Sequence, residues 1–312
     1  MLLISSLLGL VQGFDFPARS SIFPALIEKK QMMSAVSLNS ILWQGSRMIL
    51  PAIGGFLISI TDTSLIFFIC GIGFFCMMTV LLTLEVRQDN HANDAPWHEF
   101  KEGVKFVLHH RLFLTLILLS WISMFFGTSY VQIMPLFADM LQSGERGYGL
   151  LISATGVGSI IGNLFISRYQ QSRKLGIMML SSAAMAPCSL IGFSLVAWIL
   201  ADTAGAFWMA CCFAILTAAL SSVFLVSSMT VLQIKVPDAI RGRVMGIHSI
   251  TFSMISLGGL AAGVLASQFS APMAVVIGAI VVLSSVTWVA FKVREISNLD
   301  LNQQSKHAES FQ

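Results

Sequence analysis

The sequence predicts an all-α polytopic membrane protein that crosses the bilayer about nine times. Hydrophobic residues make up 56% of the 312 residues and charged residues only 11%, whereas soluble domains carry about 25% charged residues. So little charge could not cover a water-exposed surface. The hydrophobic residues gather in runs of about 20, the length of a membrane-spanning helix, and the basic residues lie almost entirely in alternate loops.

The predicted spans begin at the first residue. The first two carry one charge each, Asp15 at the end of one and Arg47 inside the other. Asp202 separates two long runs, and the last apolar stretch is too long for one helix and divides before Pro272. The nine spans are about 1–16, 36–60, 64–84, 112–138, 147–167, 175–201, 203–234 and two within 244–291.

The loop charges orient these spans. Sixteen Lys and Arg residues lie in alternate loops, and only Arg146 lies in the intervening ones. Because basic loops stay in the cytoplasm, this asymmetry predicts a cytoplasmic C-terminus and, with nine spans, an external N-terminus. The first span has no charged flank and no signal peptide, so nothing in the sequence explains how an external N-terminus would cross the membrane. We therefore expect an odd number of further helices before Met1, which would place the N-terminus in the cytoplasm. The alternative is a genuine nine-span protein.

Polar segments divide the chain into four parts. Residues 1–85 hold three spans, and 86–111 form an amphipathic linker expected along the cytoplasmic membrane surface. Residues 112–295 hold six spans, and 296–312 form a polar tail predicted to be disordered.

Charges inside a membrane are functional candidates because their desolvation in lipid is costly. Asp15 and Arg19 are four residues apart and could pair on a continuing helix, a geometry that Pro17 weakens. Their place near the interface favours a structural gate or anchor. Arg47 lies half-way along its span, before the helix-bending Pro51, so it must face protein or water. It could hold two helices together or bind substrate.

Polar residues within the apolar spans, Ser129, Tyr130, Gln132 and Asn163, could line a pore or satisfy one another between helices. Gly158 and Gly162 form a packing step for a neighbouring helix. The five cysteines show no spacing for a metal site or a disulfide framework, and no basic face is suited to nucleic acid. The sequence contains no set of residues with the spacing of a catalytic site, so we expect the protein not to be an enzyme and to bind no metal or cofactor.

Several short motifs resemble the major facilitator superfamily, in particular the exporter branch that contains the enterobactin exporter and macrolide efflux proteins. The motif LPAIGG at 50–55 is similar to a signature of the fifth helix of proton-driven exporters, with Pro51, Gly54 and Gly55 in place and Leu50 where Gly is expected. Further matches are FPAR at 16–19, GYGLL at 147–151, VPD at 236–238 and RGRV at 241–244.

The resemblance implies that the chain corresponds to helices 4–12 of the superfamily fold and lacks its first three. It implies a monomer in the bacterial inner membrane that exports a small amphipathic molecule, a siderophore or a drug, by alternating access driven by the proton gradient. Trp43, Tyr130 and similar residues would line the pathway. Since no carboxylate lies at mid-depth in the nine spans, a proton-coupling acid would belong to the missing helices. The alternatives are an importer of a sugar or metabolite, and an inactive remnant.

Overall fold

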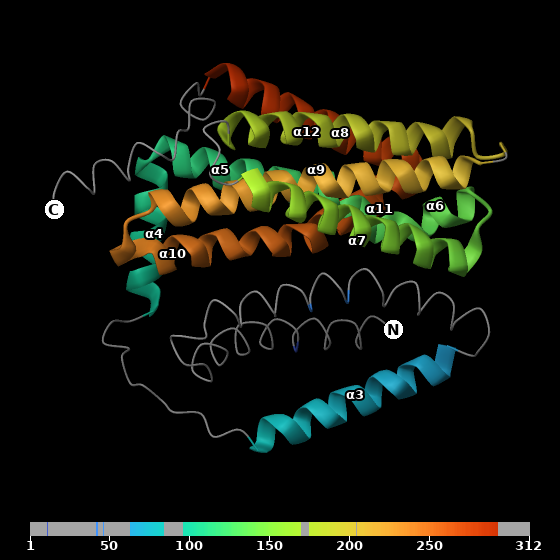
Figure 1. Cartoon of the computed structure of the whole chain (residues 1–312), viewed down its shortest axis with the longest axis horizontal. Helices are drawn as coiled ribbons and strands as arrows, with labels where there is room; N and C mark the ends of the chain where they lie inside the picture. Colours follow the sequence, from blue (N-terminus) through green and yellow to red (C-terminus); the bar gives the residue numbers. More distant parts are fainter. Residues whose placement is uncertain are drawn as a thin grey trace. The chain divides into compact units, whose positions relative to one another are not determined.

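The computed structural model describes residues 63–83, 96–169, 175–203 and 205–292, together with the single positions 11, 42 and 46. The described residues form helices joined by short turns, and they contain no strand (Figure 1). This confirms the predicted all-α class. The chain divides into two compact units, one made of Met1–Ser46 with Asp62–Asn93, the other of Arg47–Thr61 with Asp94–Gln312.

Within the described residues, seven helical segments are long and apolar enough to cross a membrane. They match the last seven predicted spans, whereas the predicted spans at about 1–16 and 36–60 lie outside the described residues. The seven segments are Ser64–Thr83, Arg111–Met140, Gly144–Arg168, Leu175–Ile199, Ala206–Leu232, Arg243–Gln268 and Ala271–Lys292.

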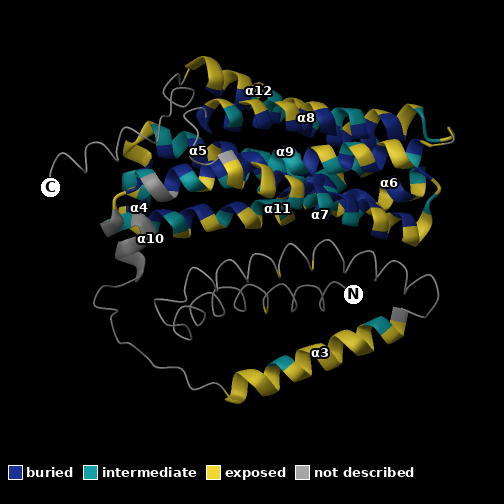
Figure 2. Ribbon diagram, in the orientation of Figure 1, coloured by how far each residue is buried: buried dark blue, intermediate teal, exposed yellow. Residues whose placement is uncertain are grey.

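Helix α3, Thr63–Thr83, is the described span of the first unit. It is apolar on every side and exposed along almost its whole length (Figure 2). A helix without a polar face is typical of a membrane span, because lipid and neighbouring helices offer the same apolar surroundings. No charged side chain occurs within it.

Helix α4, Pro96–His109, precedes the six spans of the second unit. A proline at its first position suits a helix start, where no intrahelical donor is lost. Val107 of α4 is buried with the core of the spans, and Gly103 lies against Arg243 and Ile247 of α10, Asp238–Ser249. Glu102 also forms a salt bridge with Arg243. The linker helix is therefore fixed to the start of one span.

The six spans pack through small residues and buried hydroxyls. Helix α7, Gly144–Tyr169, lies against α9, Ala206–Lys235, and α9 also packs on α8, Leu175–Ile199. A Cβ atom at Gly158 or Gly162 would overlap the α9 backbone at Ile215 or Ala219, which confirms the predicted packing step. Ser194 of α8 donates a hydrogen bond of 2.8 Å to the Pro272 carbonyl of α12, Ala271–Lys292. Such contacts replace the hydrophobic driving force that lipid cannot supply.

The first span of this unit is not the continuous helix that its apolar run predicts. It consists of α5, Arg111–Ile122, a π-helical segment, Ser123–Thr128, a 3₁₀ segment, Ser129–Ile133, and α6, Met134–Met140. Pro135 gives a physical reason for the part of the break next to α6, because its nitrogen cannot donate to the Val131 carbonyl and its ring collides with that carbonyl. We call Ser123–Ile133 the interrupted segment.

Candidate functional site

The interrupted segment occupies the middle of its span. Residues 123–133 lie between the 12 residues of α5 and the seven of α6, in a membrane-spanning segment that runs from Arg111 to Met140. Irregular backbone at membrane depth is tolerated only where protein covers it or where it lines an aqueous cavity. In transporters, interrupted helices commonly form the substrate or ion site. This segment is therefore our candidate functional site.

Glycines of two neighbouring helices approach the interrupted backbone. Gly258 of α11, Ser253–Gln268, is buried where a Cβ atom would overlap the Phe125 carbonyl. A Cβ atom at Gly278 of α12 would lie 2.9 Å from the Phe126 carbonyl oxygen. Both helices thus come within backbone contact of the π-helical segment, where carbonyl groups lack the regular helical geometry. Only glycine leaves room for this approach.

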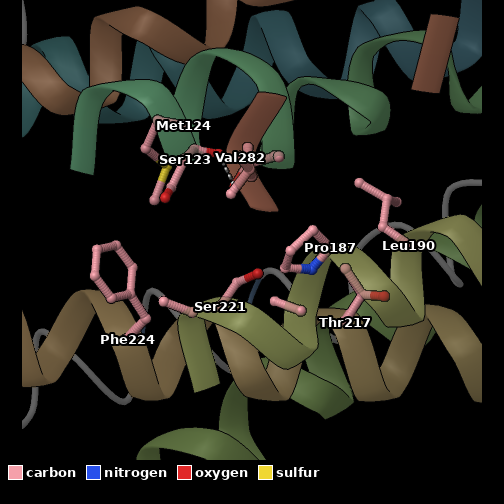
Figure 3. Close-up of a pocket in the computed structure, with 12 residues that line it drawn as sticks. Ser123, Met124, Pro187, Leu190, Thr217, Ser221, Phe224 and Val282 are labelled. Atoms are coloured by element: carbon pink, nitrogen blue, oxygen red, sulfur yellow. Dashed lines mark hydrogen bonds between the residues drawn. The ribbon is translucent and has the colours of Figure 1, made fainter. Parts of the chain in front are cut away.

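A small cavity lies on one side of the interrupted segment, between it and α8, α9 and α12 (Figure 3). Its volume is about 20 Å³, enough for one water molecule and far too small for a cargo. Ser123, Met124 and Val282 line it from one side, and Pro187 and Thr217 from the opposite side.

Several polar groups face this cavity. The Ser123 hydroxyl is buried and has no hydrogen-bond partner among the described residues. Thr217 donates a hydrogen bond of 2.9 Å to Ser189, which in turn donates to the Phe213 carbonyl. Pro187, inside α8, cannot donate to the carbonyl of the residue four positions earlier, Ala183, which also lines the cavity.

A second cavity, of about 10 Å³, lies against the same segment on the α11 side. Phe125, Phe126, Ser129 and Tyr130 line it from the interrupted segment, and glycine and alanine residues line it from α11 and α12. The rings of Phe125 and Phe126 meet edge to face, with centroids 4.7 Å apart. The interrupted segment is thus closely packed against its neighbours, with only two small voids beside it.

Tyr130 and Gln132, predicted together as site residues, point in different directions. Tyr130 is only 3% exposed and its ring lies 5.7 Å from that of Phe193 in the core. Gln132 is exposed, and the stem of its side chain lies against Gly259 of α11. The other seven predicted site residues lie outside the described residues: Asp15, Arg19, Trp43, Arg47, Pro51, Gly54 and Gly55.

The site carries hydroxyls, aromatic rings and no charge. The described acidic residues of the second unit lie in α4, at the start of α10 or at the ends of spans: Glu99, Glu102, Asp139, Glu145, Asp202 and Asp238. Within the described residues no group of His, Cys, Asp and Glu could hold a metal ion. Binding here would depend on apolar contact and neutral hydrogen bonds.

Sequence reasoning missed Ser123, Pro187 and Thr217 as neighbours of one cavity. A signal was present for the proline, since Pro187 stands inside an otherwise uninterrupted apolar run and a proline frees a carbonyl in such a helix. Nothing in the sequence indicated that this carbonyl lies near Ser123, which belongs to a different span.

Comparison with known proteins identifies the family. The transmembrane secretion effector family matches residues 1–311. Two relatives, both named enterobactin exporter EntS, come from Escherichia coli O1:K1 / APEC and Shigella boydii serotype 18. Each is 28% identical over 274 residues, an alignment that covers 84% of this chain and 63% of the relative.

The chain thus spans less than two thirds of the length of these curated relatives. No solved structure matches it. The matching family and both relatives are membrane transporters and not enzymes. With seven apolar helical segments in its described part, the chain is a multi-pass membrane protein that belongs to the transmembrane secretion effector family of the major facilitator superfamily.

Proposed function

We propose that the chain acts in the export of small amphipathic molecules, a siderophore or a drug, by alternating access. The observation that carries this proposal is the interrupted segment, which combines irregular backbone at mid-depth with hydroxyl and aromatic side chains and no charge. Sugars and amino acids need several hydrogen-bonding or charged groups, whereas an amphipathic cargo gains affinity mainly from apolar burial. The EntS relatives support export of a siderophore.

The two cavities beside the segment are too small to be the cargo site. At about 20 and 10 Å³ they cannot hold a cargo, so the cargo would bind on the exposed side of the segment, where Gln132 lies.

Proton coupling is part of the same proposal. Within the described spans no carboxylate lies at mid-depth. We therefore place the proton-binding acid outside the described residues. The protein would work as a monomer in a bacterial inner membrane with its C-terminus in the cytoplasm, as the basic loops indicate.

Alkylation of an introduced cysteine tests the cargo class and its location. In a variant without the five native cysteines, Gln132→Cys should react with a water-soluble maleimide, since thiolates form in water and not in lipid. A catecholate siderophore or a lipophilic drug should slow this reaction, and a sugar or an amino acid should not.

The matched control is Ile280→Cys, also at an exposed position of a span, on α12. It should react slowly and show no protection. Protection of Gln132→Cys by a sugar alone would favour an importer, and an unreactive Gln132→Cys would place this side chain in lipid and refute the proposed site.

A further inference from the structure

An open groove of about 960 Å³ runs between α5 and α12 at the end of the second unit where α5 begins and α12 ends. Arg111 is the first residue of α5 and Lys292 the last of α12, so both cations stand at the same end of the groove. Among the described residues that line it there is no carboxylate.

Below the two cations the groove is apolar. Leu114, Leu118 and Ile122 lie four residues apart on α5 and form one stripe along the helix. The hydroxyls of Thr115 and Ser285, which also line the groove, donate to carbonyls of their own helices at 2.7 Å. These hydroxyls need no further partner, so the lower part of the groove suits hydrocarbon.

The length of the groove matches one leaflet of a bilayer. Its α5 wall extends from Arg111 to Ile122, which at a rise of about 1.5 Å per residue corresponds to roughly 17 Å. Half of the hydrocarbon core is about 15 Å thick. A groove with cations at one end and apolar walls over this length has the dimensions of a phospholipid.

Trp288 marks the membrane interface inside the groove. Its side chain is 58% exposed, and the Lys292 ammonium lies 5.1 Å from the centroid of its ring. Tryptophan is enriched at headgroup level, and basic pockets between spans bind anionic headgroups. The Lys292 ammonium therefore lies at the depth in the membrane where it can contact a lipid phosphate.

We propose that this groove binds one anionic phospholipid of the surrounding bilayer. Its phosphate would contact Arg111 and Lys292, and an acyl chain would lie along Leu114, Leu118 and Ile122. The groove ends at Ile122, directly before the interrupted segment, so a bound lipid would support α5 where the regular helix stops. This inference does not depend on what the protein exports.

Quenching of Trp288 by brominated lipids tests the proposal on the full chain reconstituted in phosphatidylcholine vesicles. The contribution of Trp288 is the difference from the Trp288→Phe variant. At equal mole fraction, brominated phosphatidylglycerol should quench it far better than brominated phosphatidylcholine. One basic residue near an anionic headgroup raises affinity about fivefold, so the two together predict a preference of roughly 25-fold.

Charge variants distinguish lipid binding in the groove from general electrostatic attraction of anionic lipids to the protein. Arg111→Gln with Lys292→Gln should reduce the preference to less than about fivefold, and Arg111→Lys with Lys292→Arg should retain it. The matched control, Arg168→Gln with Lys235→Gln, removes two cations at the ends of α7 and α9 and should also retain it.

Equal quenching by both lipids would overturn the proposal. So would an equal loss in the control pair, which would indicate surface attraction only. If deletion of 296–312 were needed before any lipid quenched Trp288, the groove would hold the C-terminal tail instead.

Discussion

Replacing Gly258 with alanine tests the close contact that shapes the interrupted segment. The new methyl group would overlap the Phe125 carbonyl, a backbone atom that cannot rotate away. Overpacking of this kind costs about 1–3 kcal/mol. Gly263 lies on the same helix, and a methyl group there meets no described atom within 4 Å. Gly263→Ala is therefore the matched control.

Both substitutions gain the same helix propensity, up to about 1 kcal/mol, so the difference between them isolates the overlap. For domains of 150–250 residues 1 kcal/mol corresponds to about 2–4 °C, so a cost of about 1–3 kcal/mol should make Gly258→Ala melt about 2–12 °C below Gly263→Ala. The assay is thermal unfolding of the two purified variants in the same detergent. Equal melting temperatures would refute the close approach of α11 to the interrupted segment, because both glycines lie inside α11 and only at Gly258 would a methyl group meet another backbone.

Three further predictions address the cavity, the topology and the second span. Ser123→Val removes a buried hydroxyl without a partner among the described residues and fills the cavity beside it. It should therefore raise the free energy of unfolding by about 1 kcal/mol in chemical denaturation. Destabilisation would show that a bound water uses the hydroxyl. Cysteines introduced at Ser143 and Asn93 of a cysteine-free variant should label from the outside and the inside of intact cells, respectively, and labelling of both from outside would contradict the orientation. Arg47→Leu should reduce transport or folded yield at least tenfold more than Lys29→Leu, since only Arg47 lies deep within a predicted span, and equal mild effects would show that it is dispensable.

The spans were predictable because membrane insertion depends on a local property. A run of about 20 apolar residues without charge must satisfy its backbone internally, and a helix does so. The ends of 64–84 and 175–201 accordingly lie within two residues of the helix ends in the structure. The seven confirmed spans needed no knowledge of tertiary contacts.

The interrupted segment was not predictable from hydropathy, because hydropathy does not record the pattern of backbone hydrogen bonds. Pro135 was a visible sign of a break, but its effect on Ser123–Ile133 depends on how Gly258 and Gly278 pack against the freed backbone. The different surroundings of Tyr130 and Gln132 were hidden for a related reason. In a span that is apolar on all sides, no polar face indicates which side turns to the core.

The lipid groove depends entirely on tertiary structure. Arg111 and Lys292 stand near opposite ends of the predicted six-span region, and each alone is an ordinary basic residue at a helix end. The return of α12 alongside α5 places them at one end of a shared groove. Loop charges in the sequence predicted only that both residues lie on the same side of the membrane.

Transport into everted vesicles tests the central claim most directly. The vesicles come from cells that express the full open reading frame containing this chain, and an imposed pH gradient, acidic inside, supplies the driving force. The account predicts gradient-dependent accumulation of a catecholate siderophore or a lipophilic drug, reduced at least tenfold by collapse of the pH gradient, with no accumulation of a sugar or an amino acid. Accumulation of a sugar, or failure to accumulate any amphipathic compound tested, would contradict it.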